Sequence, residues 1–159
     1  GVEPGDTFVV VQDEEVDTGG ESYDIEADAL VQNASNVVKR FKVVIHARWE
    51  GDRGTLDERF TYSDGTTQRR VWQINRTGDD TYTGQADDVV GKAHGRVSGN
   101  SLHWVYTLRL PVDDDVYHVQ FDDWMYLQPG GVLVNRAEMS KFGIRVGEIV
   151  LFFSKTADR

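Results

Sequence analysis

The side chains of this sequence that could do chemistry are carboxylates within apolar, strand-like stretches. Glu58 alternates with Leu56 and Phe60, so a strand would place all three on one apolar face. Asp122 and Asp123 interrupt the run FDDWMYL and would face opposite sides of a strand, so at least one is expected inside. Burial raises a carboxyl pKa towards the range of a general acid or base. Glu58, Asp122 and Asp123 are therefore the candidate catalytic residues; the alternative is that they only satisfy arginine or backbone donors.

An arginine is the predicted partner of Glu58, and the turn between the two residues decides the pairing. A two-residue turn would place Glu58 opposite Val71. A three-residue loop in which Gly65 takes a positive φ pairs Glu58 with Arg70. Only this second register puts the apolar rows of both strands on one side, so we predict this pair on the inner face. It either fixes the strand register or forms a polar anchor in a ligand pocket.

Aromatic side chains are the second group that could contact a ligand. Several tryptophans and tyrosines fall on apolar faces, where they either fill the core or line a cavity. Arg136 is a candidate partner for one carboxylate of the 121–127 stretch. The candidate ligand-binding residues are therefore the predicted ion pair, the inward rings and this arginine, namely Glu58, Arg70, Trp72, Trp104, Tyr106, Trp124 and Arg136.

Alternation with a period of two predicts the strands that carry these side chains. Between 41 and 49, and again between 102 and 110, one face is apolar, as a half-buried antiparallel strand requires. Turn-forming clusters separate such runs at hairpin distances, which favours an up-and-down meander that closes into a barrel. We expect strands near 7–12, 23–32, 37–50, 55–62, 66–75, 80–87, 89–97, 101–110, 116–127, 132–138 and 147–155.

We therefore predict an all-β fold, a single antiparallel up-and-down β-barrel of the lipocalin or calycin kind with about 8–10 strands. The 159 residues fit one such domain over residues 1–159. No apolar run reaches the roughly 20 residues of a membrane helix. The chain begins with Gly1 instead of Met, so an export signal or lipid anchor is expected only as a segment already removed.

Composition disfavours several partners and cofactors. A net charge of −10 argues against a nucleic-acid partner, because neutralising phosphates requires a basic surface. The absence of cysteine excludes disulfides, zinc–thiolate sites and cysteine nucleophiles. The histidines lack metal-ligand spacing, and glycine loops for phosphates or dinucleotides are missing. We therefore expect neither a metal nor a cofactor, and the oligomeric state stays open.

Several motifs in this order also resemble one bacterial protein family. They are LDERFTYSDGTTQRRVW (56–72), YTGQADDVVGKAHG (82–95), NSLHWVYTLRLPV (100–112), FDDWMYL (121–127) and NRAEMSKFGIRVGEIVLFF (135–153). From about Val38 to Lys155 the chain is similar to the domain-of-unknown-function 3833 family, whereas the first 35 residues match it poorly. The resemblance implies a lipocalin-like barrel, lipoproteins among some members and, in some genomes, an association with lipid-modifying enzymes. The compartment stays open: we expect a periplasmic or envelope location if an export signal was removed, and a cytoplasmic one otherwise.

Three hypotheses of function follow. The leading one is binding of an apolar or amphipathic small molecule or lipid, such as a fatty-acyl or isoprenoid species, because rings and an isolated ion pair share the predicted inner face. The second is a cofactor-independent isomerase, cyclase or hydratase of a lipid-like substrate, with an inward carboxylate as acid or base and an arginine stabilising an anion. The third is a structural or partner-binding role in a lipid-modifying assembly. We favour binding over catalysis.

Overall fold

The structure is a computed structural model that describes residues 21–33, 36–112, 114–128 and 132–155. Within these residues the chain forms strands only. The ten strands are β1 (Glu21–Asn33), β2 (Asn36–Glu50), β3 (Arg53–Tyr62), β4 (Thr67–Arg76), β5 (Thr81–Gln85), β6 (Ala93–Ser98), β7 (Ser101–Val112), β8 (Asp115–Gln128), β9 (Val132–Lys141) and β10 (Ile144–Lys155). Across this described part of the chain there is no helix with the length and apolar character of a membrane span.

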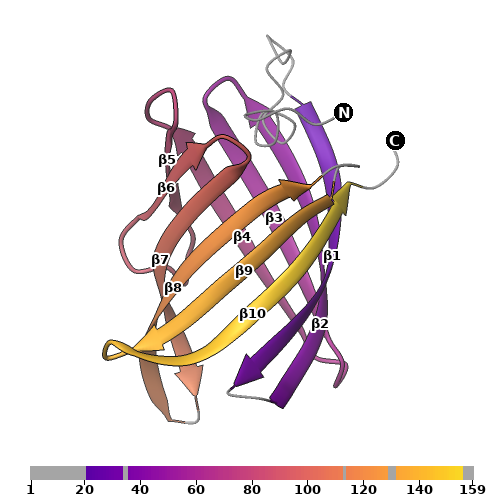
Figure 1. Ribbon diagram of the computed structural model, residues 1–159, viewed down its shortest axis with the longest axis vertical. Helices are drawn as coiled ribbons and strands as arrows, with labels where there is room; N and C mark the ends of the chain where they lie inside the picture. The colour runs from indigo at the N-terminus through magenta and orange to yellow at the C-terminus, as the bar shows by residue number, and fades with distance from the viewer. Residues whose placement is uncertain (1–20, 34–35, 113, 129–131, 156–159) are drawn as a thin grey trace.

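The ten strands close into one barrel. Each strand pairs antiparallel with its neighbours in sequence, and β1 also pairs with β10, so the strand order closes on itself (Figure 1). This confirms the predicted all-β, up-and-down antiparallel barrel. The β3–β4 and β7–β8 hairpins lie at the end of the barrel opposite the start of β1 (Figure 1).

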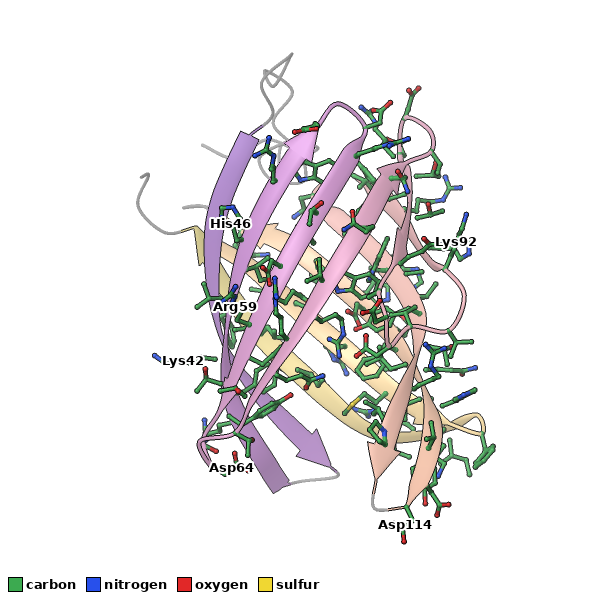
Figure 2. The ribbon with its side chains drawn as sticks, turned by 180° about the vertical axis from the view of Figure 1, so that it is seen from behind. Lys42, His46, Arg59, Asp64, Lys92 and Asp114 are labelled. Carbon is green, nitrogen blue, oxygen red and sulfur yellow. The ribbon has the colours of Figure 1, made fainter. Side chains whose placement is uncertain are left out.

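Strand β2 shows how the sequence pattern separates the two faces of the wall. From 40 to 50, buried and exposed side chains alternate without interruption. This confirms the predicted inner row, which consists of Phe41, Val43, Ile45, Ala47 and Trp49. Charged side chains such as Lys42 and Arg59 lie on the outer face, while Asp64 and Asp114 lie at hairpin tips (Figure 2). The hydrophobic effect therefore selects the side of the sheet that closes inward.

The β3–β4 hairpin has the predicted register. Gly65 takes a φ of 88°, which glycine adopts without steric cost, and closes a three-residue loop after Tyr62. Glu58 consequently lies opposite Arg70 in the ladder, and Leu56 lies opposite Trp72. The loop length thus decides that both of these pairs face the barrel interior.

Two sequence-predicted strands differ from the structure or fall outside it. The strand expected near 7–12 lies outside the described residues. The strand expected over 89–97 begins only at Ala93, because the segment before it forms a loop along β7 with an isolated bridge from Val89 to Leu108. In that loop Gly91 takes a φ of 64°, a left-handed conformation that interrupts an extended strand.

Glycines on the inner wall make room for the tryptophan rings. A Cβ at Gly95 would lie 2.4 Å from Cε3 of Trp104, and a Cβ at Gly84 would lie 2.6 Å from Cζ2 of the same ring. Gly54 likewise leaves space for the ring of Trp49. Real Cβ atoms do not approach this closely, so these rings lie flat against bare backbone. The barrel can therefore hold large rings inside and still keep space between them.

Candidate functional site

A cavity of about 350 Å³ lies inside the barrel. This volume is within the range of small-molecule sites, which are mostly apolar with a few placed polar groups. Its lining has that composition, with Leu, Ile, Phe, Trp and Met side chains from both core clusters. We call its central polar side chains the interior polar cluster, and they are Glu58, Arg70, Tyr106, Asp123 and Asn135.

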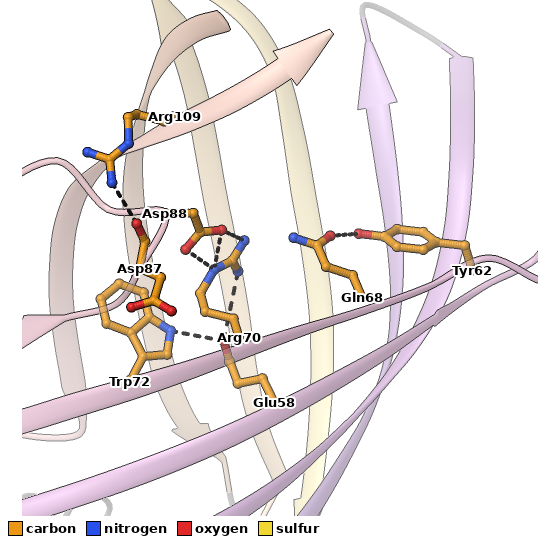
Figure 3. Close-up of polar contacts among 8 residues, drawn as sticks. All are labelled: Glu58, Tyr62, Gln68, Arg70, Trp72, Asp87, Asp88 and Arg109. Atoms are coloured by element: carbon orange, nitrogen blue, oxygen red, sulfur yellow. Dashed lines mark hydrogen bonds and ion pairs between the residues drawn. The ribbon is translucent and has the colours of Figure 1, made fainter.

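Arg70 is held mainly by an aspartate that does not belong to a strand. Its Nε atom lies 3.0 Å from both carboxylate oxygens of Asp88, and its Nη2 lies 2.9 Å from Oδ2 (Figure 3). The Nη1 atom lies 3.8 Å from Oε1 of Glu58, which is a longer ion pair. Desolvation lowers the pKa of Arg70, but the Asp88 hydrogen bonds and the charge of Glu58 outweigh it and raise this pKa. Arg70 therefore stays charged although its side chain is only 11% exposed.

The position of Asp88 follows from the shortness of β5 and β6. Strand β4 pairs with β5 only from Gln73 onward, so its first half has no strand beside it on that side. The loop over 86–92 covers this part of the wall. Its backbone is tied to β7, since Val90 N donates to Thr107 O at 2.9 Å and Arg109 N donates to Asp88 O at 2.8 Å. These backbone hydrogen bonds fix Asp88 beside β7, while the Asp88 side chain binds Arg70 on β4.

Glu58 is an incompletely compensated carboxylate inside the barrel. Its Oε1 accepts a hydrogen bond of 2.9 Å from Nε1 of Trp72 (Figure 3), and its side chain is 16% exposed. Desolvation by burial raises the pKa of Glu58 to about 7, against the lowering effects of Arg70 and of the Trp72 hydrogen bond. Glu58 can therefore exchange a proton near neutral pH, which is a property of catalytic and ligand-binding carboxyl groups.

Asp122 and Asp123 face opposite sides of β8, as predicted. Asp123 is 6% exposed and lines the cavity, and its Oδ1 has no hydrogen-bond partner. Burial raises its pKa well above the usual range, and the charges of Glu58 and Asp122 act in the same direction, against hydrogen bonding by Tyr106. Asp122 instead lies 2.6 Å from Nε2 of His103 on the outer face. The cavity thus contains a second carboxyl group whose pKa is raised by burial.

Five of the predicted ligand-binding residues line the cavity together, namely Glu58, Arg70, Trp72, Trp104 and Tyr106. The rings of Trp72 and Tyr106 meet edge to face at 5.1 Å between centroids. Trp72 contacts Trp104 at 5.6 Å. The aromatic residues and the polar cluster therefore form one continuous inner surface.

The structure corrects two predictions, because Trp124, expected as an inward ring, and Arg136, expected as a partner of Asp122 or Asp123, both lie outside the barrel. Trp124 is 40% exposed and stacks on His103 outside the barrel, with 4.1 Å between ring centroids. Arg136 is exposed and pairs with Glu148, also outside. The physical reason is the period of two, because an inward Asp123 forces its neighbour Trp124 outward, and inward Asn135 and Ala137 do the same to Arg136.

Sequence reasoning missed two polar residues of this site. Asp88 falls between the two strands expected over 80–87 and 89–97, so no alternation signalled its contact with Arg70. Asn135 is buried in the cavity wall, and its Nδ2 donates to the Trp124 carbonyl oxygen at 3.2 Å. A single polar residue after three apolar ones was the available signal for Asn135. Among the described residues, no group of three or more His, Asp or Glu side chains could hold a metal ion.

Comparison with known proteins assigns the chain to a family. Residues 21–155 match the family described as "Protein of unknown function (DUF3833)", and the chain belongs to this family. The match starts at residue 21 and includes β1, which corrects the expectation that the first 35 residues as a whole match poorly. Searches of curated proteins and of solved structures each found no significant match.

Proposed function

For this member of the DUF3833 family, we propose that the barrel binds an apolar or amphipathic small molecule, such as a fatty-acyl or isoprenoid species. The observation that carries the proposal is the cavity of about 350 Å³, whose mostly apolar lining surrounds one interior polar cluster. The third hypothesis, a structural role, would require an interior filled with side chains. The cavity argues against that hypothesis, because the interior is not filled.

The apolar and the polar part of the lining would contact different parts of an amphipathic ligand. Apolar side chains such as Phe41, Phe60 and Leu151 form a buried cluster along one side of the cavity. An apolar chain that leaves water for this surface gains roughly 25 cal/mol per Å² of buried area. The interior polar cluster then fixes the position of a polar group, since a buried polar atom without a partner is costly.

Native mass spectrometry and a displacement assay test the proposal. We expect the purified full chain to bind N-phenylnaphthylamine, a neutral fluorophore, and to release it to long-chain lipids. Ala137 is buried on the inner face of β9, so Ala137→Phe places a ring inside the cavity. Glu138→Phe places the same ring on the outer face of the same strand and is the matched control.

The two variants should differ by about tenfold or more in affinity for the fluorophore, which is about 1.4 kcal/mol. Thermal unfolding of both variants must first show that each is folded. If Ala137→Phe binds as well as Glu138→Phe, or if the parent chain binds no apolar molecule, the proposal is wrong.

Acid–base catalysis on a lipid-like substrate is a second candidate, favoured by a Glu58 pKa of about 7 beside the cavity. Arg70 is already paired with Asp88, so it does not offer the free cation that the sequence hypothesis assigned to it. Incubation with a bacterial lipid extract, followed by mass spectrometry, tests this candidate. An isomerised or hydrated product should be lost in Glu58→Gln and kept in Asp122→Asn. If no lipid changes, or if Glu58→Gln retains the activity, this candidate is excluded.

A further inference from the structure

We propose that the ligand of this cavity carries a polar end that donates hydrogen bonds. The affinity should be highest for a primary amine and lower for a neutral hydroxyl, and free carboxylates should be rejected. The inference rests on the proposed function, because it names the chemistry of the ligand that the same cavity takes. It follows from the pairing of the polar atoms in the interior polar cluster: some already have partners, and the others remain for a ligand.

The one cation of the interior polar cluster is already paired. Nε and Nη2 of Arg70 contact the carboxylate of Asp88, and its Nη1 points to Glu58 at 3.8 Å. A ligand carboxylate would have to displace Asp88, which its backbone link to Arg109 holds in place. Breaking a buried ion pair of this kind is costly, so Arg70 is a poor receptor for an anionic ligand.

Two acceptor atoms of the interior polar cluster remain for a ligand. Oδ1 of Asp123 is buried on the cavity wall without a hydrogen-bond partner. Asn135 donates one hydrogen bond from Nδ2 to a backbone carbonyl, and its amide oxygen is an acceptor that it can offer to the cavity. The two residues are diagonal neighbours on β8 and β9, since Asp123 pairs with Ala137. A ligand that donates hydrogen bonds can satisfy both of these oxygens, whereas a carboxylate only accepts hydrogen bonds and can satisfy neither oxygen.

Charge favours the same ligand. The charge of Glu58 raises the pKa of Asp123, and the charge of Asp88 raises the pKa of Glu58. An ammonium group would offset this repulsion, whereas a carboxylate would add a further negative charge to a poorly solvated site. One buried donor, Nε1 of Trp49, also lacks a partner, but a neutral N–H does not compensate a carboxylate's charge.

Displacement of N-phenylnaphthylamine by three ligands with the same chain tests the inference. The ligands are decylamine, decanol and decanoate, used at neutral pH below their micelle-forming concentrations. We expect decylamine to bind about tenfold or more tightly than decanoate, with decanol between them. Asp123→Asn replaces an acidic group with an amide that can also donate, so it should reduce the ratio of amine to carboxylate affinity by about tenfold.

Glu58→Gln is the second variant and should shift the ratio in the same direction. Asp122→Asn is the matched control, because Asp122 lies beside Asp123 in sequence but on the outer face, and it should leave the ratio unchanged. If the fluorophore binds and decanoate displaces it as well as decylamine does, the inference is wrong while the proposed function stands. The inference also fails if Asp123→Asn and Glu58→Gln both leave the ratio unchanged. If the fluorophore does not bind at all, the proposed function fails first.

Discussion

The outer and inner faces of the β3–β4 hairpin carry similar ion pairs with opposite electrostatic results. On the outer face, Arg69 contacts Asp57 through two hydrogen bonds of 2.7 and 2.9 Å. These bonds, more than any other effect, lower the pKa of Asp57. One residue further along, Glu58 and Arg70 meet at 3.8 Å on the inner face, and burial raises the pKa of Glu58 to about 7.

The difference shows that the same residue types act differently on the two sides of one wall. Outside, water solvates both partners, so a carboxylate keeps its charge and the pair contributes little. Inside, desolvation penalises the charged form, and Asp88 takes most of the hydrogen bonds of Arg70. Glu58 is therefore left poised to bind a donor or exchange a proton, which the outer carboxylate is not.

Removing the inner cation should have the largest effect. Arg70→Met leaves Asp88 and Glu58 without their shared partner in a poorly solvated wall. We expect the free energy of unfolding to fall by about 3–5 kcal/mol. Arg69→Met on the outer face should cost much less, because water solvates both partners of that pair. Denaturant unfolding of both variants measures the comparison, and equal losses would show that the two faces are not electrostatically different.

The second largest effect should be on the pH dependence of stability, which should differ between Glu58 and Asp57. The pKa of Glu58 is raised from 4.5 to about 7 in the folded state, so the folded state binds this proton more tightly. Its stabilising contribution is fully present below pH 4.5 and is lost as the pH rises through about 7. Compared with Glu58→Gln, the parent chain should lose up to about 3 kcal/mol over this interval. Urea unfolding of both proteins across the interval measures this, and parallel curves would refute the raised pKa.

The outer pair should produce the smallest effect, with the opposite sign. The pKa of Asp57 is lowered below 3.8, so its contribution is present above that pH and is lost as the pH falls through the folded-state value. Asp57→Asn should cost less than about 1 kcal/mol at neutral pH, and added salt should reduce the cost. Unfolding at low and high salt measures this. A larger or salt-independent loss would mean that Asp57 behaves as a buried group.

The strand pattern and one turn could be predicted from the sequence because both are local. The alternation of β2 separates its faces within eleven residues, and the loop that ends at Gly65 sets the ladder that places Glu58 opposite Arg70. The stretch around Asp122 and Asp123 was ambiguous, because apolar residues occupy both of its faces. A period of two shows that neighbours face opposite ways, and it does not show which of them is inside.

Local sequence patterns are therefore enough to predict most of the strands, the closed meander and the residue opposite Glu58 in the ladder. The folded barrel is needed to show that Asp123 faces the cavity, that Trp124 and Arg136 face water, and that Asp88 binds Arg70. The physical reason is distance along the chain. Ladder pairing within a hairpin depends on a few turn residues, whereas contacts across the interior depend on how all ten strands curve and close.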